Sequence, residues 1–75
     1  MERYVVTVCP EAGRYTEHPF RAKGLAFAYA KRKLPANCEP EIMVEHQSRA
    51  SEDTPWIGLN AWTFHAHGDI EHTRL

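Results

Sequence analysis

The sequence has little of what secreted or membrane proteins usually show. Only two of its 75 residues are cysteine, and no apolar run approaches the roughly 20 residues of a membrane-spanning helix. The chain turns from Met1 directly into an alternating pattern, without the long apolar run of a secretory signal. We therefore expect a cytoplasmic protein that does not enter membranes, with Cys9 and Cys38 as free thiols. A single bridge between them is the alternative, since it would stabilise a small core.

The usual signs of catalysis are also missing. The four glycines are isolated, so they form no phosphate-binding loop, and no serine or cysteine stands in a recognisable nucleophile context. A chain this short buries only about 60% of its unfolded surface, which leaves room for one core but makes a catalytic pocket hard to enclose. We expect a single domain over residues 1–75 that is not an enzyme and has no cofactor.

Alternation of apolar and polar residues predicts three strands in the first two thirds of the chain. Residues 3–9 are rich in β-branched and aromatic side chains, and residues 10–13 have the proline and glycine of a turn. Residues 14–18 then form a short return strand. Apolar and polar residues alternate again over residues 40–47. This pattern predicts a strand whose solvent-facing side carries Met43, Glu45 and Gln47.

A fourth strand is predicted near the end of the chain. Residues 48–55 are polar and form a loop, and residues 61–67 are the firm part of the strand that follows, with Asn60 at a bend or bulge. The alternation points Trp62, Phe64 and Ala66 to the core and Thr63, His65 and His67 the opposite way. The tail after Asp69 is too short and polar to assign.

The segment from Phe20 or Arg21 to Leu34 predicts a helix. It is rich in strong helix formers, and its apolar residues recur every three or four positions. Ala26 and Ala30 would let the helix lie close to a sheet, with Leu25, Phe27 and Leu34 at the edges of the contact. Pro35 ends the helix.

The order strand, strand, helix, strand, strand predicts an α+β fold in which one helix packs on a four-stranded antiparallel sheet. The predicted core consists of apolar residues from all of these elements except the return strand: Val6, Val8, Phe27, Ile42, Val44, Trp62 and Phe64.

Charge is unevenly divided along the chain, although the net charge is only −1. Residues 1–34 carry a net charge of +4, and residues 35–75 carry −5. Such a division predicts a bipolar surface that steers a charged partner, unless the two halves interleave in the fold.

Each half offers a candidate binding surface. The basic one is a possible phosphate-contacting patch next to Tyr29; the alternative is a solvated helix end whose cations offset the helix dipole. The acidic one lies beside Trp56, whose amphipathic ring could anchor a partner or pack under its own loop. The candidate partner-binding residues are Arg14, Arg21, Lys31, Arg32, Lys33, Glu52, Asp53 and Trp56.

Histidines near the end of the chain suggest a metal site as a third possibility. His65, His67 and Asp69 match part of the H-x-H-x-D-H zinc motif of the metallo-β-lactamase family, but Ile70 stands where the last histidine belongs, so we do not assign that family. Apart from any family, the imidazoles of His65 and His67 are two residues apart and share a strand face, so they could bind a metal together. His72 or Asp69 could add a third ligand. The simpler interpretation is solvent-facing histidines without a metal.

In size, compactness and layout the whole chain resembles the small inhibitors, anti-CRISPR proteins among them, that phages and mobile elements use against bacterial defence systems. The resemblance implies a protein that occludes or bridges a site on a larger protein or nucleoprotein complex. Glu39, Glu41, Glu52 and Asp53 would imitate phosphates, or the basic helix end would meet an acidic patch. The alternative is a small nucleic-acid-binding or regulatory domain. Free sheet edges allow either a monomer or a homodimer.

Overall fold

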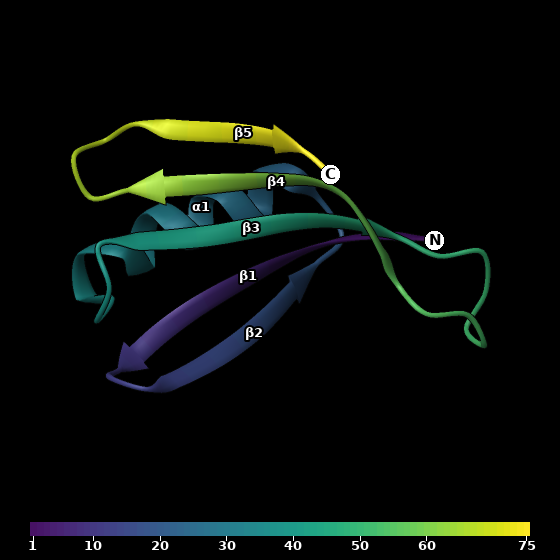
Figure 1. The fold of residues 1–75 in the computed structure, drawn as a ribbon, viewed down its shortest axis with the longest axis horizontal. Coiled ribbons are helices and arrows are strands. Elements are labelled where there is room, and N and C mark those ends of the chain that lie inside the picture. The colour runs from purple at the N-terminus through teal and green to yellow at the C-terminus, as the bar shows by residue number, and fades with distance from the viewer.

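The computed structural model describes residues 1–75 and contains one sheet and one α-helix. The sheet is antiparallel throughout, with strand order β2-β1-β3-β4-β5. The helix lies behind the sheet in Figure 1, so that it covers one face and leaves the other uncovered. The predicted α+β class and single packed helix are confirmed, but the prediction of four strands was wrong because a fifth strand follows the fourth.

The first two strands form the predicted hairpin. β1 (Glu2–Glu11) pairs with β2 (Arg14–Phe20), and both strands are longer than predicted. Gly13, in the turn between them, has a φ of 81°, a left-handed conformation that glycine adopts without steric cost. β1 then pairs on its other side with β3, which makes the first strand an interior strand of the sheet.

The helix begins later than predicted. α1 spans Lys23–Lys33, because Phe20 remains in β2 opposite Tyr4 and Ala22 has extended backbone, with φ −121° and ψ 138°. After Lys33 the chain tightens into the short 3-10 helix η1 (Leu34–Ala36), where Pro35 occupies the first turn. No helix of the structure has the length and apolarity needed to cross a membrane.

The third strand lies within one residue of its prediction, whereas the fourth begins before residue 61 and ends before residue 67. β3 (Glu41–Ser48) pairs with β4 (Ile57–His65), and the register shifts where Gln47 faces Gly58 and His46 faces Asn60. Leu59 therefore has no partner on β3. This irregularity confirms the bulge expected near Asn60.

The end of the chain differs most from the prediction. β4 ends at His65, so Ala66 and His67 lie in a turn and Ala66 is exposed rather than in the core. Gly68, with a φ of 105°, completes the turn. The chain then returns as β5 (Ile70–Arg74), an edge strand with every residue exposed. A strand with no buried face has no alternating burial pattern for the sequence to reveal.

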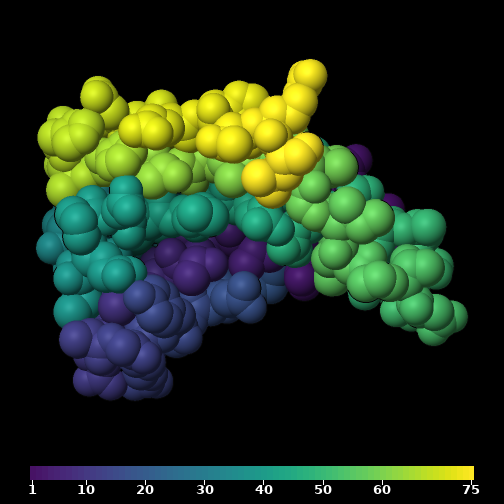
Figure 2. Space-filling view, viewed as in Figure 1, coloured from purple at the N-terminus to yellow at the C-terminus, as the bar shows by residue number.

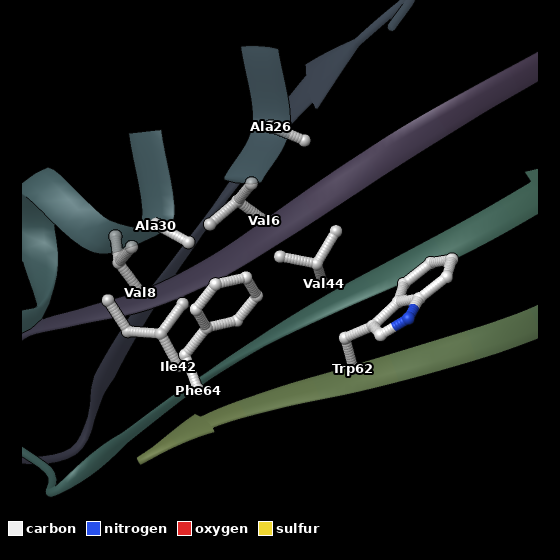
Figure 3. Close-up of a cluster of buried hydrophobic side chains, with 8 residues drawn as sticks. All are labelled: Val6, Val8, Ala26, Ala30, Ile42, Val44, Trp62 and Phe64. Atoms are coloured by element: carbon white, nitrogen blue, oxygen red, sulfur yellow. The ribbon is translucent and has the colours of Figure 1, made fainter. Parts of the chain in front are cut away.

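The core lies between α1 and the covered face of the sheet (Figure 3). Val6, Val44 and Trp62 are cross-strand neighbours in the centre of this face. Ala26 and Ala30 are completely buried, so the helix backbone lies close to the strands. Phe27 packs edge-on against Phe64, with ring centres 4.9 Å apart. All predicted core residues lie here, with Phe27 partly buried, whereas Leu25, expected at the edge of the contact, points into solvent.

Candidate functional site: the uncovered face of the sheet

Figure 2 looks onto the face of the sheet that α1 leaves uncovered. Alternation along each strand sends every second side chain to this face, and register aligns Thr7, Met43 and Thr63 across its centre. The surface is hollowed over β1, between β2 and β3. Met43 is 47% exposed there, although it occupies a central strand.

Carboxylates surround this centre on several strands. Glu17 faces Thr7 across the β1–β2 pair, and Glu71 faces Thr63 across the β4–β5 pair, so both share the orientation of Met43. The strands and the residues before β3 bring the following glutamates to what we call the acidic face: Glu17, Glu39, Glu41, Glu45 and Glu71. The one basic strand residue with this orientation is Arg3, whose Nε donates a hydrogen bond to Gln47 Oε1 at 2.7 Å.

His65 lies between two carboxylates of the acidic face. Its Nδ1 is 3.2 Å from Glu41 Oε2 and its Nε2 is 2.8 Å from Glu71 Oε1. The contact at Nε2 does not have the alignment of a hydrogen bond, so this buried nitrogen lacks a well-directed partner. Both carboxylates remain mostly exposed, and the imidazole therefore holds two acidic groups at neighbouring positions on the surface.

A hollow of about 210 Å³ opens at one end of the acidic face. Tyr15 from β2 donates its hydroxyl hydrogen bond to Glu39 Oε2 at 3.0 Å. This bond, and then the negative charge of Glu39, raises the pKa of Tyr15 above its usual value. The hollow combines apolar surface with carboxylates, and it is lined by Thr7, Cys9, Tyr15, Glu39, Glu41, Met43 and Thr63.

Basic side chains gather on the opposite side of the molecule. The last turn of α1 carries Lys31, Arg32 and Lys33, and the guanidinium carbon of Arg32 and Nζ of Lys33 lie 5.3 Å and 5.6 Å from the centre of the Tyr29 ring. A second hollow, of about 390 Å³, runs between this helix end and β2, and Tyr29 and Lys33 contribute to its wall. The covered side also carries Lys23, whose Nζ lies 4.8 Å from the centre of the Trp62 ring. The glutamates named above thus lie on one face of the domain, and the cations of α1 lie on the other.

No family model, curated protein or solved structure matches this chain.

The predicted basic residues do not form one patch. Arg14 lies at the start of β2 and pairs with Glu11 at 3.3 Å, both side chains being exposed. Arg21 precedes α1 while Lys31 to Lys33 end it, so they lie at opposite ends of an 11-residue helix, which is about 16 Å long. Only the three residues of the last helical turn are close neighbours.

The predicted acidic residues are divided as well. Glu39 and Glu41 lie at the start of β3, whereas Glu52 and Asp53 lie in the loop after its end, which projects beyond the sheet in Figure 1. An eight-residue strand separates the two pairs by about 26 Å. The carboxylates that join Glu41 are instead those of neighbouring strands.

Trp56 is half-buried at the base of this loop. Its ring lies within cation–π distance of two arginines, with guanidinium carbons 4.1 Å (Arg3) and 4.2 Å (Arg49) from the ring centre. The indole thus packs against its own chain, and its role as a partner anchor stays a prediction.

The three histidines considered as metal ligands do not meet. The rings of His65 and His67 stack with centres 5.0 Å apart, but His72 stacks on Trp62 on the covered side of the sheet. No group of three or more histidine, cysteine or acidic side chains has an arrangement that could hold a metal ion.

Sequence reasoning missed part of the acidic face. The alternation in β3 does place Met43 and Glu45 on the wet side of the sheet, as predicted. Glu17 and Glu71 join them only through strand register, and Glu71 belongs to the strand that was not predicted. Tyr15 gave no signal beyond its place in the return strand.

Proposed function

We propose that this protein is a non-enzymatic binding protein that occludes a site on a larger protein or nucleoprotein complex through its acidic face. The observation that carries the proposal is the gathering of glutamates from three strands, β2, β3 and β5, and from the residues just before β3, on a face that no helix covers. Complementary charge steers partners together and fixes their relative orientation. The fitting partner surface is basic, as a nucleic-acid-binding groove is.

The centre of the acidic face supports this proposal with apolar contact area. Met43 and Tyr15 are 47% and 57% exposed, and tyrosine and methionine are enriched in interfaces. A ring of carboxylates around such a centre provides a polar rim around an apolar core. The glutamates would occupy the positions of phosphates on the partner.

Inhibition of a bacterial defence complex is the specific instance that we propose, in keeping with the resemblance in size and layout to phage-encoded inhibitors. Such binding would take place in the cytoplasm. Both cysteines are free thiols, which is the usual state in that reducing compartment.

Affinity capture with two matched variants tests the proposal. The tagged protein is incubated with nuclease-treated lysate of the native host, beside Glu41→Lys/Glu71→Lys on the acidic face and Lys31→Glu/Lys33→Glu on the helix. All four positions are exposed, and circular dichroism checks that both variants fold. We expect the parent protein to retain a nucleic-acid-binding complex and added oligonucleotide to displace it. The acidic-face variant should retain at least 10-fold less of the complex, and the helix variant should retain nearly as much as the parent protein. Equal retention by all three proteins, or turnover of a small molecule by the purified protein, contradicts the proposal.

A second candidate is direct nucleic-acid binding through the helix end. The observation that favours it is the position of Arg32 and Lys33 around the Tyr29 ring, since basic groups beside an aromatic ring are suited to a single strand. Fluorescence anisotropy with labelled single-stranded RNA and duplex DNA, at increasing salt, distinguishes the candidates. Salt-dependent binding that Lys31→Glu/Lys33→Glu abolishes would favour this second function.

A further inference from the structure

The two cysteines of the chain are neighbours in space. Cys9 lies near the end of β1 with only 2% of its surface exposed, whereas Cys38 is exposed in the segment between η1 and β3. The backbone N–H of Cys38 donates a hydrogen bond to the carbonyl of Cys9, with 2.7 Å between nitrogen and oxygen. Both thiols are reduced in the structure.

Asn37 fixes the segment that carries Cys38. Its side-chain Oδ1 accepts a hydrogen bond from the Cys9 backbone N–H at 2.6 Å. Its Nδ2 donates to the carbonyls of Glu39 and Glu41 at 2.9 Å and 3.0 Å. The side chain of Asn37 and the backbone N–H of Cys38 therefore both bond to the backbone of Cys9, which holds Cys38 against it.

This spacing suits a disulfide. With a backbone N···O distance of 2.7 Å, standard bond lengths keep the Cα atoms of Cys9 and Cys38 no more than about 6.6 Å apart, below the upper limit of about 6.8 Å found for bridged cysteines. The side chain of Cys38 is also close enough to affect the Cys9 thiol. Burial is the main reason that the pKa of this thiol is raised, and the neighbouring Cys38 and Glu39 raise it further. Bridging thus requires rotation of side chains rather than rearrangement of the sheet.

We propose that Cys9 and Cys38 form a redox modification site that closes to an intramolecular disulfide when a small-molecule disulfide, such as glutathione disulfide, is present. The exposed Cys38 thiolate attacks one sulfur of glutathione disulfide, which forms a mixed disulfide and releases one glutathione thiolate. Cys9 then loses its proton to solvent and attacks the Cys38 sulfur. This second exchange releases the other glutathione and leaves the protein oxidised by two electrons.

The bridge would link the end of β1 to the residues that begin β3. Cys9 and Glu39 both line the hollow at the end of the acidic face, so oxidation would fix one rim of that hollow. The thiol chemistry itself does not depend on the proposed partner binding. It follows from the proximity of the two residues alone.

Intact-mass analysis after alkylation tests the proposal. The reduced protein is equilibrated in glutathione buffers of increasing disulfide fraction, quenched with acid, and alkylated after denaturation. We expect a monomer lighter by two hydrogens that takes no alkyl group and carries no glutathione. Cys9→Ser should instead stop at a single glutathione adduct on Cys38, and Cys38→Ser should react at least 10-fold more slowly than the parent protein because Cys9 is buried.

Two outcomes would overturn the proposal. One is a doubly glutathionylated protein at high disulfide fraction, which would show that Cys9 does not resolve the mixed disulfide. The other is a covalent dimer linked through Cys38. Peptide mapping of the oxidised monomer identifies the bridge directly, and this readout is unaffected by whether the acidic face binds any partner.

Discussion

The guanidinium carbon of Arg3 lies 4.1 Å from the centre of the Trp56 ring, and the same side chain donates a hydrogen bond from Nε to Gln47 at 2.7 Å. One residue of β1 thereby contacts the end of β3 and the base of the loop that follows it. The loop is fixed at its base by this contact, although its tip projects from the sheet.

Arg3→Met should lower the free energy of unfolding by about 1–2 kcal/mol, because it removes a cation–π contact and a side-chain hydrogen bond. Urea denaturation followed by tryptophan fluorescence measures the change. Arg14→Met is the matched control, since Arg14 makes only an exposed ion pair with Glu11, and it should change stability by less than about 0.5 kcal/mol. Equal effects of the two substitutions would contradict this role for Arg3.

Ala30→Leu should destabilise the protein by about 1–3 kcal/mol, because Ala30 is completely buried between helix and sheet and the larger side chain has no space. Ala28, two positions away on the same helix, is exposed. Ala28→Leu therefore makes the same chemical change without overpacking, and thermal denaturation should show little shift. A similar shift for both would mean that the contact between α1 and the sheet is looser than described.

Tyr15 should titrate at a higher pH than an unperturbed tyrosine, because its hydroxyl donates to the Glu39 carboxylate. Glu39→Gln removes the negative charge and should lower the pKa of Tyr15 towards its usual value of about 10. The phenolate absorbance, compared with Tyr15→Phe to assign the signal, measures this. With the folded-state pKa raised, the stability from this group is complete below about pH 10 and is lost as the pH rises through the folded-state pKa. An unchanged titration in Glu39→Gln would refute the interaction.

Asn37→Ala should cost about 2–3 kcal/mol, because Asn37 makes three hydrogen bonds that connect the end of β1 with the start of β3. Asn37→Asp keeps the acceptor for the Cys9 backbone N–H but cannot donate to the two carbonyls, so it should also be destabilising. Chemical denaturation gives the stabilities, and native-state alkylation of Cys9 should be faster in both variants. Unchanged alkylation would show that Asn37 does not keep this region closed.

Local sequence patterns predict most of the fold because its central elements each have one buried face. Val44 and Phe64 alternate with polar or exposed residues, and Ala26 and Ala30 repeat with helical spacing. β5 has no such signal, since all of its residues remain exposed. The start of α1 was misjudged because Phe20 has a cross-strand partner that composition cannot reveal.

The candidate site was less predictable than the fold. Charge along the chain divides into a basic and an acidic half, but the fold divides charge between faces, and this depends on strand order. Glu17 belongs to the basic half, yet it shares the acidic face with Glu71 because each faces a threonine of the same cross-strand row. Register between distant strands is a tertiary property that local alternation does not determine.

The position of β1 between β2 and β3 also governs how the domain can assemble. Two parts of the sheet can form between near neighbours in the chain: the hairpin of β1 and β2, and the three-stranded meander from β3 to β5. These parts join only where residues such as Arg3 and Gln47, which are 44 positions apart, come together. Closing that long loop costs entropy before any apolar area is buried, so it governs the height of the folding barrier. Neither half buries its apolar face until the other arrives, and folding is expected to be all-or-none.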